Sequence, residues 1–358
     1  MKYLTAIVLI FSVLGALDRI FGGWLGIGKE FDKAFHLLGA MALSMIGMIV
    51  ISPFLAELMR PVSMFMESVF HMDASIIPAS LFANDMGGAA LASEMAAEPK
   101  LGLYNALVVS SMMGCTISFT LPFALGVVEK EYHRDLMSGL LCGIVTIPIG
   151  CLIAGFLCGL QVVPLIVNLI PLLLFSGFIA VGLIMAPELS IKIFKGFGVL
   201  ITAIITVGLS LGIIRFLTGF EVIQGLATIE EGAAICLNAA VVLSGSFPFV
   251  YVLTKLLSKP LKIVGGKIGI NETSVVGIIS TLASSATAFG MMDKMDKKGI
   301  VVNAAFAVSG AFVLGSHLAF TLAFNKSYIL PVIVGKLVAG IAAAVLAGII
   351  YKKINKQK

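Results

Sequence analysis

Long apolar stretches separated by short polar segments dominate the chain. Several of these stretches exceed the roughly 18 residues that a helix needs to cross a bilayer. The pattern predicts an all-α polytopic membrane protein with about nine spanning helices. We place them at residues 3–17, 33–58, 101–128, 136–160, 162–186, 197–217, 232–257, 299–324 and 328–351.

One segment between two of these spans is apolar but interrupted. Residues 73–94 read DASIIPASLFANDMGGAALASE, so Asn84, Asp85, Gly87 and Gly88 divide the segment into two short halves. As helix, residues 74–84 would rise about 16 Å, which is half of a bilayer core. Irregular backbone at membrane depth is tolerated only where protein buries it or where it lines a wet cavity. The segment therefore predicts a re-entrant helical hairpin, and the alternative is a surface loop with an Asp-x-Gly-Gly turn.

The second half of the chain returns to the same order of polar and helix-breaking features. The features that pair are a proline-containing span end (52–54 and 247–249), an amphipathic segment (61–72 and 259–270), a helix-start signal (73–75 and 272–274) and a polar tip (84–88 and 284–287). Asn105 and Ser111 are likewise matched by Asn303 and Ser309. We expect one transport domain over residues 1–358, with repeat one at about 33–160, repeat two at about 232–351 and linking spans at 162–217. The repeats are inverted, which brings two discontinuous elements to the membrane midplane.

Composition supports the membrane class, since 59% of residues are hydrophobic, 12% are charged and the mean hydropathy is +1.10. The net charge of +5 is then a signal of topology and gives no reason to expect a nucleic-acid partner. Most Lys and Arg residues fall on the side of the C-terminus. We therefore expect a protein of the cytoplasmic membrane with its N-terminus outside and its C-terminus in the cytoplasm. The five cysteines show no CxxC pairing, and we expect neither a metal nor a cofactor.

Eight short strings, in this order along the chain, are similar to the ethanolamine utilisation permease (EutH) family over nearly the whole length. They are LDRI (17–20), GAMAL (39–43), DMGG (85–88), SMMG (111–114), GIVTIPIGC (143–151), FGMM (289–292), NAAFAVS (303–309) and IVGKL (333–337). The resemblance implies uptake of ethanolamine across the cytoplasmic membrane. The chain departs from the family pattern in two places: Ser284-Ser285 stand where paired asparagines are usual, and Ser316 replaces a usually acidic residue.

Ethanolamine is a small ammonium ion with a hydroxyl group, so a midplane site needs one negative group and a few polar contacts. Asp85 is the first candidate because ionisable residues inside a membrane usually mark a pathway; alternatively it only caps the second half-helix. The glycines would let backbone approach the ligand. The full set of candidate substrate-binding residues is Asn84, Asp85, Gly87, Gly88, Ser284, Ser285, Thr287, Asn105, Asn303 and His317.

Several alternatives stay open at this point. Asn105, Asn303 and His317 fit interhelical hydrogen bonding as well as substrate contact. Lys336 is expected near the outer end of the last span, where it snorkels to the interface or repels other cations. The sequence favours a facilitator, and the alternative is an ion-coupled transporter for another small polar or cationic solute. An enzyme is not favoured, because the common nucleophile and metal motifs are missing from the sequence. A homo-oligomer is compatible with the sequence.

Overall fold

The computed structural model describes the backbone of residues 2–356 and the side chains of residues 5–256, 266 and 269–352. This part of the chain is 85% helical and contains no strand. Seven helical segments in it are long and apolar enough to cross a membrane. They are Ile27–Leu58, Pro99–Val127, Lys130–Leu157, Val162–Met185, Pro187–Thr218, Ile229–Leu256 and Lys326–Lys352. The prediction of an all-α polytopic membrane protein is confirmed.

The segment predicted as a continuous span at 299–324 is divided in the structure. Helix α15 (Lys297–Gly310) ends before a non-helical stretch, and α16 (Ser316–Phe324) begins after it. Within the stretch, Phe312 has a φ of 61°. Its N–H donates to the Thr281 carbonyl at 3.1 Å, and the Leu314 N–H donates to the Leu282 carbonyl at 2.8 Å. The prediction of one continuous helix over 299–324 was wrong. The helix is broken because these two N–H groups bond to carbonyls at residues 281 and 282 instead of to the preceding helical turn.

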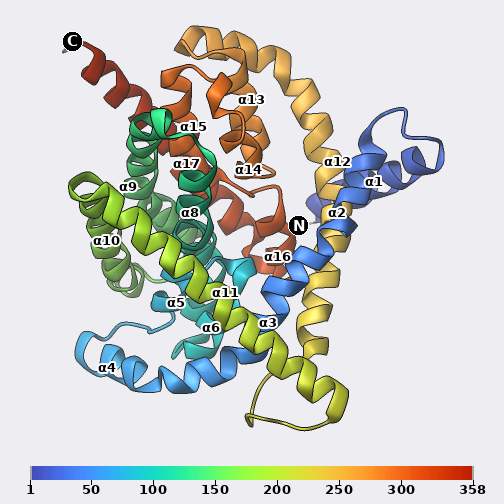
Figure 1. Ribbon diagram of the computed structural model, residues 1–358, viewed down its shortest axis with the longest axis vertical. Coiled ribbons are helices and arrows are strands. Elements are labelled where there is room, and N and C mark those ends of the chain that lie inside the picture. Colours follow the sequence, from blue (N-terminus) through green and yellow to red (C-terminus); the bar gives the residue numbers. More distant parts are fainter. Residues whose placement is uncertain (1, 357–358) are drawn as a thin grey trace.

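The first predicted span corresponds to α1 (Lys2–Ile20), whose side chains are described from residue 5 on, and that it crosses the membrane stays a prediction. A second difference concerns α12 (Ile229–Ile268), a single helix of 40 residues. It includes both the predicted span at 232–257 and most of the amphipathic segment expected as a separate element at 259–270. In the first half the corresponding region is divided, because α3 (Leu38–Leu58) and α4 (Arg60–Phe70) are distinct helices. Helix α4 buries none of its residues and lies across the lower end of the molecule in Figure 1.

The first interrupted segment forms two short helices with a turn between them. They are α5 (Ile76–Leu81) and α6 (Gly88–Met95), joined through the 3₁₀ turn η1 (Asn84–Met86). Asp73 closes the base of this pair: its Oδ2 accepts hydrogen bonds from the N–H groups of Ala97 (3.1 Å) and Glu98 (3.0 Å). The two ends of the segment are therefore held together on one side of the molecule.

The second interrupted segment is built in the same way. It consists of α13 (Glu272–Thr281) and α14 (Ser285–Phe289), followed by the turn η5 (Met292–Lys294). Asp296 Oδ1 accepts from the Asn271 N–H at 2.7 Å and from the Ser274 hydroxyl at 2.8 Å. A carboxylate thus links the start of this pair to the chain that follows it, as Asp73 does in the first pair.

The span after the first pair is the most deeply buried segment. It runs through α7 (Pro99–Tyr104), the π-helical stretches η2 (Asn105–Gly114) and η3 (Thr116–Thr120), and α8 (Leu121–Val127). It packs against a core of α9 (His133–Leu157), α15 and α17 (Ile329–Lys356). The close approach of α9 to α17 requires glycine, since a Cβ on Gly150 would overlap the Gly335 carbonyl.

The remaining elements complete the boundary of the bundle. They are α2 (Ile27–His36), η4 (Lys130–Tyr132), α10 (Val162–Met185), α11 (Pro187–Thr218) and η6 (Lys326–Tyr328). Helices α10 and α11 expose many apolar side chains, such as Leu174, Phe178 and Val199. This distribution fits helices that face lipid. In Figure 1, α1, α2 and α12 lie on the side of the molecule opposite α9 and α10.

Candidate functional site

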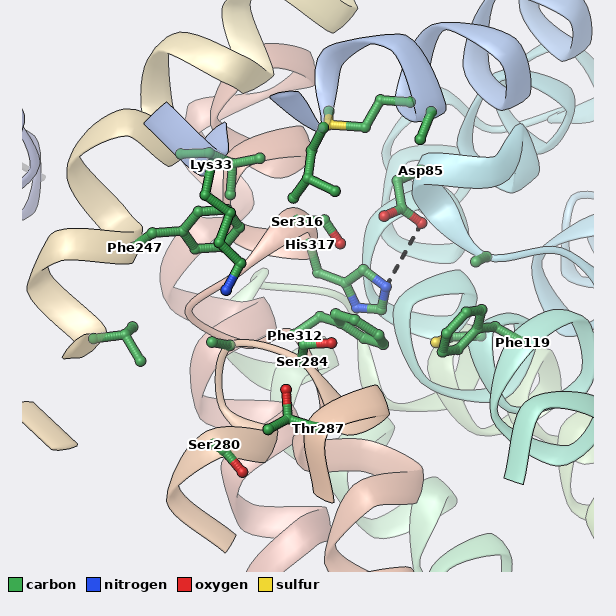
Figure 2. A pocket seen from close by; sticks show the side chains of 18 of the residues that line it. Lys33, Asp85, Phe119, Phe247, Ser280, Ser284, Thr287, Phe312, Ser316 and His317 are labelled. Carbon is green, nitrogen blue, oxygen red and sulfur yellow. Dashed lines mark ion pairs between the residues drawn. The ribbon is translucent and has the colours of Figure 1, made fainter. Parts of the chain in front are cut away.

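A cavity of about 570 Å³ lies where the two interrupted segments meet. Asp85 and Met86 line it from the first tip, Ser284 and Thr287 from the second tip, and His317 from the start of α16. Figure 2 shows Asp85 pointing toward the His317 ring, with Ser284 and Thr287 on a separate segment nearby. Four of the side chains proposed from sequence are therefore gathered around one cavity, although Asp85 precedes the other three by 199 positions or more.

The Asp85 carboxylate faces this cavity without capping a helix. The N-cap of α6 is Gly87, and no side chain makes a cap hydrogen bond there. Asp85 Oδ1 lies 3.7 Å from His317 Nε2, and Ser316 lines the same cavity. The Asp85 side chain retains 18% exposure. The carboxylate therefore does not cap α6, and part of it is open to the cavity.

His317 owes its position to the break before α16. The residue is 1% exposed, and its ring centroid lies 5.1 Å from that of Phe312. Its Nδ1 has no hydrogen-bond partner among the described residues. Because α16 begins at Ser316, the two residues that approach Asp85 stand in the first turn of a helix that the sequence pattern did not separate.

The second tip contributes through an extended residue between two helices. Ser284 is the N-cap of α14 and is extended, with φ −160° and ψ 125°, after α13 has ended at Thr281. Ser284 and Thr287 line the cavity, whereas Ser285 is fully buried and is not part of the lining. The Ser285 hydroxyl has no partner within the described part of the chain.

Asn84, Gly87 and Gly88 lie beside Asp85 but outside the cavity lining. Asn84 is fully buried, and neither polar atom of its amide has a partner among the side chains and backbone that are described. Gly87 has a φ of 91°, and a Cβ there would overlap the side chain of Met48. A Cβ at Gly88 would overlap the Phe82 carbonyl. These glycines therefore let the tip pack against its neighbours, which is a different use from the ligand approach that the sequence suggested.

Asn105 and Asn303 stand at matching places and hold the starts of the two short-helix pairs. Asn105 Nδ2 donates to Ser75 Oγ at 2.8 Å and to Asn168 Oδ1 at 2.9 Å, and Asn168 donates back at 2.7 Å. Asn303 Nδ2 donates to the Ser274 carbonyl at 2.9 Å. Neither asparagine lines the cavity. Their observed contacts fit the interhelical alternative.

The other end of the cavity is aromatic and was not anticipated. Lys33 of α2 lies 5.2 Å from the centroid of the Phe247 ring of α12 and 3.4 Å from a Glu30 oxygen. The Lys33 side chain is 56% exposed, so this region is the open end, and Asp85 stands at the closed end. The Phe247 ring and the Glu30 carboxylate, which both contact the Lys33 ammonium, form a favourable place for an ammonium group. Two phenylalanines, Phe119 and Phe312, line the deeper part.

Lys336 lies near the start of α17 but is buried. It is 0% exposed, and its Nζ donates to the Ser111 carbonyl at 2.6 Å. Snorkelling to the interface was therefore the wrong expectation. The described residues contain no group of three or more His, Cys, Asp or Glu side chains that could hold a metal ion.

Comparison with known proteins places these features in a family. The family model described as "Ethanolamine utilisation protein, EutH" matches residues 1–350. The chain is 42% identical over 351 residues to a "Probable ethanolamine permease EutH" of Listeria monocytogenes, covering 98% of this chain and 94% of that protein. It is 36% identical over 385 residues to a protein of the same description from Salmonella typhimurium, covering 97% and 94%.

A third relative, the "Uncharacterized protein YxeR" of Bacillus subtilis, is 37% identical over 341 residues, covering 95% of this chain and 92% of that protein. No solved structure matches the chain. The resemblance read from the sequence is confirmed by a family match over nearly the full length and by relatives of similar size. The chain belongs to the EutH family of ethanolamine utilisation proteins.

Proposed function

We propose that this protein is a permease that carries ethanolamine across the cytoplasmic membrane and binds the protonated amine in the cavity between the two tips. The observation that carries the proposal is the Asp85 carboxylate at the closed end of a cavity also lined by Ser284 and Thr287. The relatives described as probable ethanolamine permeases support the substrate, and their naming favours transport over catalysis.

The chemistry of the lining suits a small hydroxylated ammonium ion. The ammonium group would donate charge-assisted hydrogen bonds to Asp85, and these bonds are about twice as strong as neutral ones. The hydroxyl would pair with Ser284 or Thr287, which are both able to donate and to accept. Phe119 and Phe312 would shield the ion from bulk water and present ring faces to it. His317 would orient the carboxylate through the contact at 3.7 Å.

The transport path that we propose follows from the two short-helix pairs. They are the re-entrant hairpins of an inverted repeat, with repeat one at about 33–160, repeat two at about 232–351 and α10 and α11 as linking spans. Matched contacts support this: Asn105 bonds to Ser75 in one unit, and Asn303 bonds to Ser274 in the other. With α1 and the α15–α16 pair counted as crossings, there are nine, which puts the two termini on opposite sides of the membrane. Because most Lys and Arg residues fall on the side of the C-terminus, the C-terminus is cytoplasmic and the N-terminus is outside.

In that orientation the open end of the cavity, between α2 and α12, faces the cytoplasm. The first tip (84–88) then separates the cavity from the outer surface. Alternating access would require the tips to move relative to α2 and α12, so that Asp85 becomes accessible from outside. A transporter built in this way needs only a small rearrangement at a fixed midplane site.

The proposal is tested by uptake of radiolabelled ethanolamine into lipid vesicles that contain the purified protein. Entry should exceed that into protein-free vesicles, saturate with concentration and be reduced by excess unlabelled ethanolamine. Ethylene glycol, which has the hydroxyl but no ammonium, should compete at least tenfold less well, because it cannot form the charge-assisted bond to Asp85. Entry equal to that of protein-free vesicles would contradict the proposal.

A further inference from the structure

A buried lysine behind the wall of the substrate cavity is the feature that the proposed function does not use. Lys336 lies on α17, is 0% exposed and donates to the carbonyl of Ser111 at 2.6 Å. Ser111 belongs to the π-helical stretch η2. Burying an ammonium ion inside a membrane domain is costly unless another charge compensates it.

Asp85 is the carboxylate that can compensate this charge, because Lys336 bonds to Ser111 and Cys115, four residues further along the same span, lines the cavity together with Asp85 and His317. Cys151 of α9 follows Gly150, which packs against Gly335 beside Lys336. The two thiols are uncharged in their ordinary form, and the imidazole is uncharged when it carries one proton. With Asp85 and Lys336 both ionised, the centre of the empty protein holds one carboxylate and one ammonium, and its net charge is zero.

Entry of an ammonium substrate at Asp85 would change this balance to +1. A net charge in a site closed off from water is disfavoured by several kilocalories per mole. Loss of one proton from Lys336 restores neutrality, and a lysine can lose its proton when buried whereas an arginine cannot. Two closed states are then neutral: the empty site with protonated Lys336, and the loaded site with neutral Lys336.

We propose that Lys336 releases a proton each time an ammonium substrate binds at Asp85, so that the protein exchanges one substrate cation for one proton. This inference rests on the proposed function. On binding, the Nζ–H bond of Lys336 breaks, its electron pair stays on Nζ, and the proton passes to water on the side to which the cavity is open. On release at the other side, Lys336 takes a proton from water there. Transport is electroneutral, and the protein is coupled to the proton gradient instead of being an uncoupled facilitator.

The wild-type protein provides the first test, and it needs no variant. Vesicles hold a potassium gradient and valinomycin, which set an inside-negative potential while pH is equal on both sides. A carrier of the cation alone would accumulate ethanolamine about tenfold for each ~60 mV. The exchange predicts no accumulation under these conditions, and it predicts alkalinisation of the vesicle interior as ethanolamine enters. Accumulation that follows the membrane potential would overturn the proposal.

Two variants separate the roles of charge and proton. Lys336→Arg keeps the positive charge but not its release, so we expect net uptake and labelled-for-unlabelled exchange to fall at least tenfold. Lys336→Met leaves the loaded site neutral, so exchange of labelled for unlabelled ethanolamine, which needs only the loaded site to cross, should persist. The empty site then has a charge of −1, so its return, and with it net uptake, should fall at least tenfold at alkaline pH. Retained exchange shows that this variant is folded. Net uptake by Lys336→Arg at the wild-type rate would contradict the inference.

The outcomes distinguish this inference from the function on which it rests. If no vesicles show protein-dependent ethanolamine entry, the proposed permease function fails, and the inference fails with it. If entry depends on the protein but follows membrane potential and leaves the interior pH unchanged, the permease function stands and only the proton exchange is refuted. Asp85→Asn vesicles serve as the control for passage of neutral amine through lipid.

Discussion

Replacing Asp85 by asparagine removes the charge at the closed end of the cavity and keeps the shape of the side chain. The change should leave the fold intact, because Asp85 caps no helix and its side chain is 18% exposed to the cavity. The tip itself is held elsewhere, by the hydrogen bonds of Asp73 to Ala97 and Glu98. The effect on transport therefore reports the interaction with substrate.

The magnitude follows from the bond that is lost. A hydrogen bond to a charged group contributes about 1.5–3 kcal/mol, which corresponds to roughly a 10- to 150-fold loss in uptake at low ethanolamine concentration. The assay is the initial rate of radiolabelled ethanolamine entry into vesicles, normalised to the amount of folded protein. In Asp85→Asn, ethylene glycol should compete with labelled ethanolamine as well as unlabelled ethanolamine does. In the wild-type protein it should compete much less well.

The matched control is Glu57→Gln, which makes the same chemical change at another site. Glu57 is 71% exposed and pairs with Arg60 at 3.1 Å on the surface, where such pairs contribute little. Its uptake should stay within about twofold of wild type. Near-normal uptake by Asp85→Asn, with normal amounts of folded protein, would refute the role of Asp85 in holding the ammonium.

Three further predictions concern the framework around the cavity. Asn105→Ala removes both hydrogen bonds between Asn105 and Asn168 and the bond to Ser75, so it should lower the free energy of unfolding by about 1–3 kcal/mol with little change in the half-saturating ethanolamine concentration. A large change in that concentration with unchanged stability would place Asn105 at the substrate. Gly87→Ala should reduce the melting temperature, because the residue has a φ of 91° and the new methyl group overlaps Met48; equal stability would contradict this packing. In a background that lacks the five native cysteines, a cysteine at position 100 should react with an impermeant thiol reagent on intact cells, whereas a cysteine at position 294 should not. The reverse pattern would overturn the orientation.

Polar interruptions in apolar segments were the most informative signal in the sequence. Asp85, Ser284, Thr287 and His317 were selected on that basis, and they line one cavity. The signal works because a polar group inside a membrane is costly, so a sequence keeps few of them without a use. It does not distinguish a ligand contact from a structural bond, which is why Asn105 was selected with the others.

The features that the sequence did not reveal depend on contacts between distant segments. Gly310 and Gly315 flank the break at 311–314, but glycines inside an apolar span do not by themselves predict one. The break depends on backbone bonds from Phe312 and Leu314 to the end of α13. The burial of Lys336 is likewise set by its neighbours, because a lysine at that position in an isolated helix could extend toward the interface. The same holds for the aromatic end of the cavity, where α2 and α12 bring together Lys33 and Phe247.

The measurement that tests the account most directly is a structure of the protein with ethanolamine bound. We predict density for one ethanolamine in the cavity, with its nitrogen about 2.7–2.9 Å from an Asp85 oxygen and its hydroxyl within hydrogen-bond distance of Ser284 or Thr287. Asp85→Asn, prepared in the same way, should show a cavity without that density. Ethanolamine bound outside the cavity, with the Asp85–His317 contact unchanged, would contradict the account.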